Sequence, residues 1–296
     1  MLALITDFHG QFPKGHRVNR AGRLNGQSDR NQLQRRGDAA ATCGIAVMAK
    51  ASAPGRTKTR LVPPLTYEQA AALNTAFLQD VTSNMLLAGE HTGICGYAAY
   101  GPPGSEDFFA QILPPAIGLI GAWLPNFGDS LLHTIRQILG RGHGAAVVLN
   151  ADSPNLPTAL LVETAEILAR PGDRAVLGPS TDGGYYLLGL KFAHQRLFED
   201  IAWSTACVAE QTLARAKEIG LDIEVLPAWY DVDDIEDLRQ LSGEVRRTPT
   251  GTLKLGPGEP HHASHTAALL TVLGLGPDTG FDIRPAEPAP AVLKHA

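Results

Sequence analysis

Short apolar runs alternate with segments of helical periodicity through the middle of the chain. Continuous apolar runs predict strands that are buried on both faces, and apolar residues spaced three and four apart predict helices. The predicted strands are residues 44–48, 94–99, 145–149, 174–178, 185–190 and 223–226. The predicted helices begin after Thr66 or span residues 129–139, 158–169, 205–219 and 234–241. This alternation predicts an α/β fold with a mostly parallel sheet and helices on both faces.

Two helix starts carry capping signals. Thr66 stands three residues before Gln69, which is the spacing of a capping box. Ser204 or Thr205 is the predicted N-cap of the helix at 205–219, because a side-chain oxygen there can accept a free backbone N–H.

The two ends of the chain differ from the middle. Residues 1–40 are rich in Arg, Gly and Asn without periodicity, which predicts a flexible basic arm or an upstream start that adds nothing to the fold. Residues 242–296 are rich in Pro, Gly and Thr and predict a tail with one short helix. The remaining 41–241 is long enough for one substantial domain.

Composition excludes several classes of protein. Lys and Arg number 25 against 30 Asp and Glu, and a net charge of −5 disfavours a nucleic-acid binder. No run reaches the roughly 18 apolar residues of a membrane span, and no secretory signal pattern is present, so the cytoplasm is the expected location. Three widely spaced cysteines disfavour a disulfide framework or a zinc site. The oligomeric state is not readable from these features.

The loop after the first predicted strand is strongly basic. It contains Lys50, Arg56, Lys58 and Arg60, and alternate residues of an extended loop point the same way. In an acidic chain such a cluster predicts a di- or triphosphate ligand, although a solvated loop with scattered ion pairs is the alternative. The P-loop pattern and the dinucleotide-binding glycine pattern are both missing from the sequence.

Acidic residues follow two other strands. Asp152 comes just after the strand at 145–149 and is placed to hold a divalent cation, or else to form an Asx-turn. Asp231 and Asp233 alternate along an extended stretch, so both can face one point. Clustered carboxylates repel one another unless a cation lies between them.

Two further segments lie between these acids. In the segment 178–186, Gly183 and Gly184 allow close backbone approach to a ligand or simply form a hairpin, and Asp182 with the tyrosines can bond hydroxyl groups. Trp203 precedes a predicted helix whose free amides can meet an anion.

Together these segments resemble a known bacterial family, DUF2064. The resemblance rests on residues 46–61 (AVMAKASAPGRTKTRL), Asp-Ser-Pro at 152–154, Gly-Pro at 178–179 with Asp-Gly-Gly-Tyr-Tyr at 182–186, Trp-Ser-Thr at 203–205 and Asp-Val-Asp-Asp at 231–234. It implies a single GT-A-like (nucleotide-diphospho-sugar transferase) Rossmannoid domain over 41–241. Members are described as GT-A-fold glycosyltransferases, some linked to arsenosugar or radical-SAM/selenodomain gene neighbourhoods.

The chain is also similar to nucleotidyltransferases of that superfamily, and it departs from its own family at one place. Residues 58–61 with Pro64 resemble phospholactate guanylyltransferases and, more distantly, molybdenum-cofactor nucleotidyltransferases. Those enzymes usually have Thr-Asn where this chain has Tyr185 and Tyr186, which favours the glycosyltransferase branch. The family's Gly-Asp-Leu-Gly-Glu-Arg-like motif reads Gly-Asp-Ser-Leu-Leu-His here, at 128–133, so its specificity or activity is expected to differ.

The resemblance implies a role for each candidate residue. The Mg²⁺ or Mn²⁺ ligands would be Asp152, Asp231 and Asp233. Nucleotide phosphates would be bound by Ala49, Lys50, Gly55, Arg56, Lys58, Arg60 and Asp129. Donor or acceptor would contact Gly183, Gly184, Tyr185, Trp203, Ser204 and Thr205, with Asp182 as general base and Arg56 and Lys58 stabilising the leaving group.

Three function classes follow from these roles. The first is glycosyl transfer from a nucleotide-diphosphate sugar to a small-molecule acceptor, and it is the preferred interpretation. The second is nucleotidyl transfer from a nucleoside triphosphate with release of pyrophosphate. The third is a non-catalytic nucleotide-binding module, which the altered residues at 128–133 make plausible.

Overall fold

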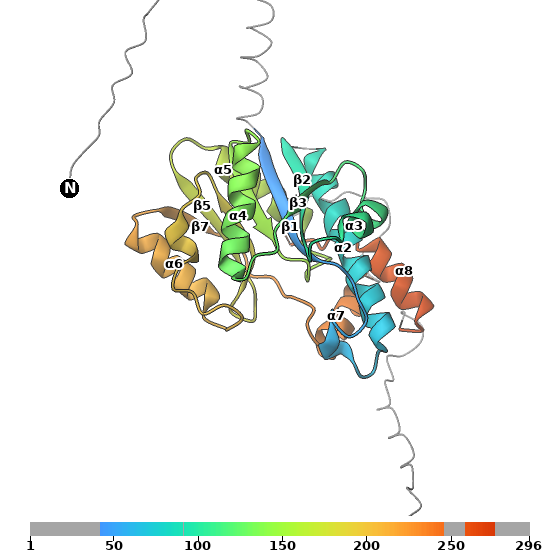
Figure 1. Cartoon of the computed structure of the whole chain (residues 1–296). Coiled ribbons are helices and arrows are strands. Elements are labelled where there is room, and N and C mark those ends of the chain that lie inside the picture. Colours follow the sequence, from blue (N-terminus) through green and yellow to red (C-terminus); the bar gives the residue numbers. More distant parts are fainter. Residues whose placement is uncertain (1–41, 91, 246–257, 276–296) are drawn as a thin grey trace, which may run out of the picture.

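The sheet has seven strands in the order β3-β2-β1-β4-β6-β5-β7 (Figure 1). This computed structural model describes residues 42–90, 92–245 and 258–275. The strands are β1 (Cys43–Lys50), β2 (Ile94–Gly101), β3 (Gly118–Gly121), β4 (Ala145–Leu149), β5 (Arg174–Pro179), β6 (Tyr185–Leu190) and β7 (Asp222–Val225). Among the strands of the described residues only β6 runs antiparallel to its neighbours, so the predicted mostly parallel α/β fold is confirmed.

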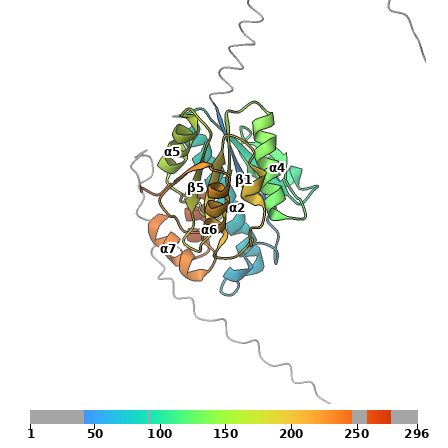
Figure 2. The same ribbon diagram turned by 90° about the vertical axis from the view of Figure 1, so that its left-hand side faces the viewer.

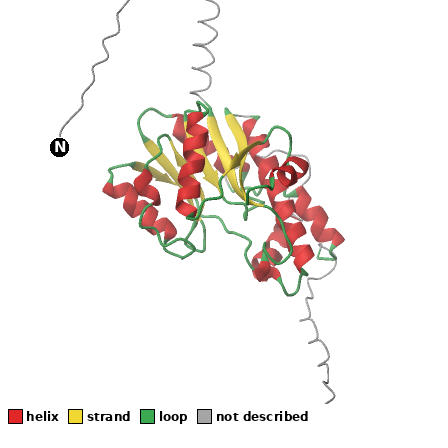
Figure 3. Ribbon diagram, in the orientation of Figure 1, coloured by secondary structure: helices red, strands yellow, loops and turns green. Residues whose placement is uncertain are grey.

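Helices cover both faces of the sheet, as Figures 2 and 3 show. One face packs against α2 (Tyr67–Gly89), α3 (Glu106–Ile112) and α5 (Thr158–Ala169). The other packs against α4 (Phe127–Gly140), the 3₁₀ turn η2 (Gln195–Phe198) and α6 (Val208–Glu218). Along β1, Ile45 and Val47 join the first layer and Ala46 the second, which is the alternation of a strand buried on both faces.

A third apolar cluster lies beside the sheet and includes the C-terminal helices. It combines α2 with the 3₁₀ turn η1 (Thr59–Leu61), α7 (Ile235–Val245) and α8 (Ser264–Val272). Leu61, Phe77 and Val232 are fully buried in it. This burial anchors the end of the basic loop at Leu61 and the segment before α7 at Val232. The predicted arm at 1–40 and most of the predicted tail lie outside the described residues.

Most predicted elements are present, with differences at their ends. The capping box of Thr66 and Gln69 is formed, and β4 and α5 have the predicted bounds. The predicted cap at Ser204 or Thr205 is wrong, because α6 begins after Cys207 and the Thr205 hydroxyl donates to the Ala202 carbonyl instead. The short elements η1, α3, β3 and η2 were not predicted.

No helix of residues 42–90, 92–245 and 258–275 combines the length and the apolar character that crossing a membrane requires.

Candidate functional site

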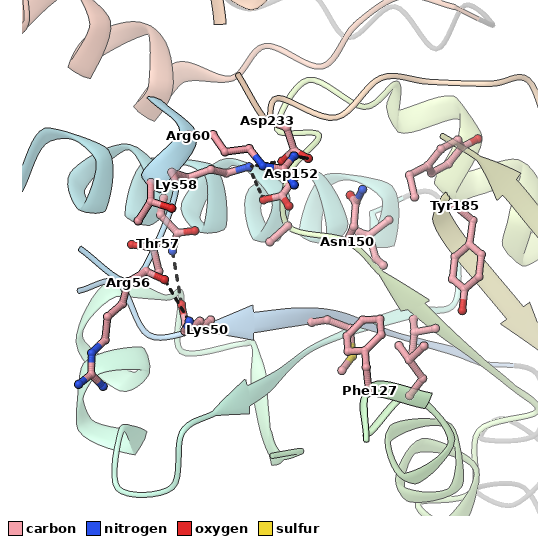
Figure 4. A pocket seen from close by; sticks show the side chains of 18 residues that line it. Lys50, Arg56, Thr57, Lys58, Arg60, Phe127, Asn150, Asp152, Tyr185 and Asp233 are labelled. Atoms are coloured by element: carbon pink, nitrogen blue, oxygen red, sulfur yellow. Dashed lines mark hydrogen bonds and ion pairs between the residues drawn. The ribbon is translucent and has the colours of Figure 1, made fainter. Parts of the chain in front are cut away.

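A pocket of about 430 Å³ opens at the carboxyl ends of β1 and β4 (Figure 4). These two strands are neighbours, and the chain leaves β1 toward β2 on one side while β4 leads to the other side of the sheet. Ligands of open α/β sheets bind at such switch points. The pocket is lined by Met48, Lys50, Arg56, Thr57, Lys58, Thr59, Arg60, Asn74, Phe127, Leu131, Val148, Leu149, Asn150, Ala151, Asp152, Tyr185, Tyr186 and Asp233.

The basic loop is folded rather than extended. Lys58 has a left-handed backbone (φ +51°), and the 3₁₀ turn η1 follows at once. A non-glycine residue in this conformation is uncommon and is found where surrounding contacts hold it. The prediction that alternate cations point the same way is therefore wrong. Lys58 and Arg60 reach toward the acids, while Arg56 points away from them in Figure 4.

Lys58 is the centre of the site. Its ammonium lies 2.7 Å from Asp152 Oδ1 and 3.4 Å from Asp233 Oδ1, and it donates to the Val232 carbonyl at 2.6 Å. The Lys58 side chain is 6% exposed, whereas both carboxylates are 39% exposed. The early cations and the distant acids thus meet in one pocket, as the sequence predicts.

Two of the other three cations that line the pocket, Arg60 and Lys50, differ in their partners. Arg60 Nη1 lies 3.2 Å from Asp233 Oδ2, and its side chain is 75% exposed. Lys50 donates to the Arg56 carbonyl at 3.0 Å and so closes the loop on itself. Both remain accessible to an anion entering the pocket.

Asp231 has different partners from Asp233. It accepts hydrogen bonds from the Asn150 amide and, at 2.7 Å, from the Ser153 hydroxyl. Burial raises the pKa of the Asp231 carboxyl to about 6, the Asp152 carboxylate adds to the rise, and these hydrogen bonds oppose it. Asp231 is thus bonded to the β4 loop and does not line the pocket, whereas Asp233 is bonded to the basic loop and does. That both face one metal ion stays a prediction.

The turn between β5 and β6 is a hairpin. Asp182 is exposed, and its carboxylate accepts the Gly184 amide at 2.9 Å. Gly183 has φ +92°, and a Cβ there would lie 2.1 Å from the Ala206 carbonyl oxygen, so this glycine is required for packing. Neither glycine nor Asp182 lines the pocket described above. Their proposed contacts with substrate stay predictions.

Tyr185 and Trp203 lie on the α4 side of the site. Tyr185 lines the pocket, but its hydroxyl is buried without a hydrogen-bond partner in the described residues. Trp203 does not line it and packs edge to face on Phe127 at 5.4 Å, above Gly128. Ser204 and Thr205 are exposed in the turn that follows. Trp203 thus bears on the site through Phe127.

The remaining predicted phosphate-binding residues are not on the pocket wall. Ala49 is buried within β1, Gly55 is exposed in the loop with φ +72°, and Asp129 is exposed in the first turn of α4. Their roles stay predictions.

Several lining residues were missed by the sequence analysis. Asn74 of α2 donates to the Ser52 hydroxyl at 2.9 Å and so holds the start of the basic loop. Asn150 lines the floor, and its Oδ1 is buried without a partner in the described part of the chain. Asn150 directly follows β4, which is a signal that could have been used. Phe127, a large apolar residue that is 51% exposed, carries no such signal in sequence.

Asp152 and Asp233 are the residues that fit a divalent metal ion. Within the described ranges, no group of three or more His, Cys, Asp and Glu side chains is arranged to bind one. Mg²⁺ at nucleotide sites usually takes one or two carboxylates together with substrate phosphates. Two partly exposed carboxylates that already converge on one cation, the Lys58 ammonium, match that donor set.

Comparison with known proteins agrees with this architecture. The family described as "Uncharacterized protein conserved in bacteria (DUF2064)" matches residues 88–205. The resemblance to DUF2064 is confirmed over these residues. A solved structure from Desulfovibrio desulfuricans G20, described as a candidate nucleotide-diphospho-sugar transferase, is 26% identical with a TM-score of 0.64. It covers 78% of this chain and 94% of its own, which confirms the GT-A-like fold.

Two more distant structures were also found. A cytidylyltransferase from Leptospira borgpetersenii serovar Hardjo-bovis is 11% identical over 78% of this chain and 93% of its own, with a TM-score of 0.47. A CMP:2-keto-3-deoxy-manno-octonic acid synthetase complexed with CTP is 12% identical, with a TM-score of 0.45. The match covers 68% of this chain and 96% of the synthetase chain. No curated protein matched the sequence.

Proposed function

We propose that this protein is a nucleotide-utilising transferase that moves a glycosyl group from a nucleotide-diphosphate sugar to a small acceptor. The observation that carries the proposal is the meeting of Lys58 and Arg60 with Asp152 and Asp233 in one pocket at the switch point of the sheet. Support comes from the 26% identical structure, whose description names a nucleotide-diphospho-sugar transferase.

The cations would act on the leaving group. In glycosyl transfer an acceptor oxygen or nitrogen forms a bond to the anomeric carbon, and the bond from that carbon to the diphosphate oxygen breaks. The electron pair stays on the diphosphate, which leaves as nucleoside diphosphate. Lys50, Lys58 and Arg60, which line the pocket, would bind these phosphate oxygens and stabilise the charge that builds on them.

Asp152 and Asp233 would hold Mg²⁺ or Mn²⁺ against the same phosphates. When bound, the metal ion supplies Lewis-acid stabilisation of the departing diphosphate. Asp231 would help to position Asp152, because it accepts hydrogen bonds from Asn150 and Ser153 in the loop that carries Asp152.

The apolar wall would contact the transferred sugar or the acceptor. Phe127 and Tyr185 lie across the pocket from the charged residues (Figure 4), and Leu131 also lines it. Trp203 packs against Phe127. Asp182 as general base remains a prediction from sequence.

Product analysis tests the proposal. The protein is screened against UDP-, GDP-, CDP- and dTDP-sugars and the free triphosphates, with and without Mn²⁺, and with a panel of small acceptors. Release of nucleoside diphosphate is the expected result. Release of pyrophosphate would assign nucleotidyl transfer instead, and binding without turnover would indicate a non-catalytic module.

A matched pair of arginine variants makes the test specific to the pocket. Arg60 and Arg170 are both exposed, and each pairs with one carboxylate at 3.2 Å, but Arg170 pairs with Glu224 away from the pocket. Arg60→Ala should weaken binding of the nucleotide about tenfold, in line with a charge-assisted contact. Arg170→Ala should leave binding unchanged.

A further inference from the structure

The Lys58 ammonium sits in a cage of three oxygens. Asp152 Oδ1, Asp233 Oδ1 and the Val232 carbonyl lie 2.7, 3.4 and 2.6 Å from it, and the side chain is 6% exposed. The Phe77 ring, whose centroid is 5.4 Å from the nitrogen, lies on another side. The ammonium therefore already neutralises the two carboxylates that the proposed function assigns to a divalent cation.

A divalent cation and this ammonium are in conflict. Both need the oxygens of Asp152 and Asp233, and two positive charges a few ångströms apart in a partly buried place repel strongly. A lysine has a flexible four-carbon stem and can exchange one anionic partner for another. Its other anionic partner in the proposed function is the phosphate.

We infer that Lys58 competes with the divalent cation for Asp152 and Asp233, so that metal and nucleotide phosphate bind together rather than independently. This inference rests on the proposed function. When phosphate draws the ammonium away, the two carboxylates become available to the metal ion. By linkage, the metal ion must raise the affinity for phosphate by the same factor.

The neighbouring cations do not share this position. Lys50 also lines the pocket, yet its ammonium donates to the Arg56 carbonyl rather than to either carboxylate. Arg60 contacts the other oxygen of Asp233, is 75% exposed and leaves Asp152 free. Lys58 is thus the cation that bridges both acids, and Lys50 provides a matched control for the loss of one pocket charge.

The test measures the dissociation constant of Mn²⁺ alone, from the electron paramagnetic resonance signal of the free ion. Full-length wild type, Lys58→Met, Lys58→Arg and Lys50→Met are compared. Lys58→Met should bind Mn²⁺ at least about tenfold more tightly than wild type. In wild type the Mn²⁺ affinity is reduced because Lys58 occupies the two carboxylates most of the time, and only the remaining fraction of molecules can bind the ion. Lys58→Arg, which keeps the charge, and Lys50→Met should stay within about twofold of wild type by the same relation.

Lys58→Gln is a second neutral variant, used in case Lys58→Met does not fold. It is neutral but keeps a donor for the Val232 carbonyl, and it should tighten Mn²⁺ binding in the same direction. Circular dichroism of each variant confirms that it is folded.

Three results would overturn the inference. These are equal Mn²⁺ affinity in wild type and the neutral Lys58 variants, equal tightening by Lys50→Met, and no Mn²⁺ binding by any form. Each of them leaves nucleotide binding to be judged separately. Failure of wild type to bind every nucleotide in the screen would instead refute the proposed function.

Discussion

The basic loop and the segment before α7 that carries Val232 and Asp233 touch each other on two sides, and the two sides are built differently. Toward the pocket they meet through Lys58, Arg60 and Asp233, beside Asp152 of the loop after β4, and these contacts are ionic and partly exposed. On the other side Leu61 and Val232, next to these residues in sequence, are fully buried in the third apolar cluster. Apolar burial therefore holds the loops in position, and the charged side remains free to exchange partners.

The largest expected effect comes from the apolar side. Phe77→Ala removes a fully buried ring that contacts the third cluster and should lower the free energy of unfolding by about 3–5 kcal/mol. Urea unfolding measures this. Phe192→Ala, at a ring that is 58% exposed, should change it by less than about 0.5 kcal/mol. Equal losses would show that the cluster does not hold the fold.

A smaller loss is expected where α8 is anchored to α2. The fully buried Asp80 carboxylate accepts the backbone amides of His265 and Thr266 and the Thr266 hydroxyl, at 2.9, 2.8 and 2.6 Å. Asp80→Asn should cost about 2–3 kcal/mol, because an amide NH₂ then faces donors in a buried place. Hydrogen exchange should show faster exchange in α8. Unchanged exchange there would contradict this anchoring.

The next effect is a pH dependence of stability, which comes from His261. Burial lowers the pKa of His261 to about 4, and His262 adds to the shift. An unfolded histidine titrates near 6.5, so between these values the unfolded chain binds a proton that the folded chain does not. The contribution of His261 to the free energy of unfolding is complete above about pH 6.5. It falls by about 1–3 kcal/mol as pH falls toward 4. His261→Gln should lose less stability than wild type between pH 7 and 4.5, and equal losses would contradict this.

The smallest effect on stability is expected on the charged side. Asp233→Asn removes ion pairs to Lys58 and Arg60 at a carboxylate that is 39% exposed. Such pairs contribute little, so unfolding should change by about 1 kcal/mol or less. Binding of nucleotide with Mn²⁺ should nevertheless fall at least tenfold, measured by calorimetry. A large loss of stability in Asp233→Asn with intact nucleotide binding would show that the charged side stabilises the fold and does not bind the nucleotide.

How much the sequence predicts depends on how local the signal is. The bounds of β4 and α5 follow from continuous apolar runs and helical periodicity. By contrast, α3 has seven residues among prolines and β3 has four at the sheet edge, so neither has a periodic pattern.

Within the site, sequence predicts the charges but not their directions. The convergence of basic and acidic residues follows from their places after parallel strands. The side chains of Lys58 and Asp231 take their directions from contacts with Asp152, Asn150 and Ser153, in a loop that is distant from both in sequence.

Calorimetric titration of the best-binding nucleotide, in the presence of Mn²⁺, tests the central claim most directly on Asp152→Asn and Asp222→Asn. Asp152 lies 2.7 Å from the Lys58 ammonium in the pocket, whereas Asp222 lies in β7 with a side chain that is 74% exposed. The account predicts that Asp152→Asn weakens nucleotide binding at least tenfold and that Asp222→Asn binds like wild type. Equal affinities in the two variants would contradict it.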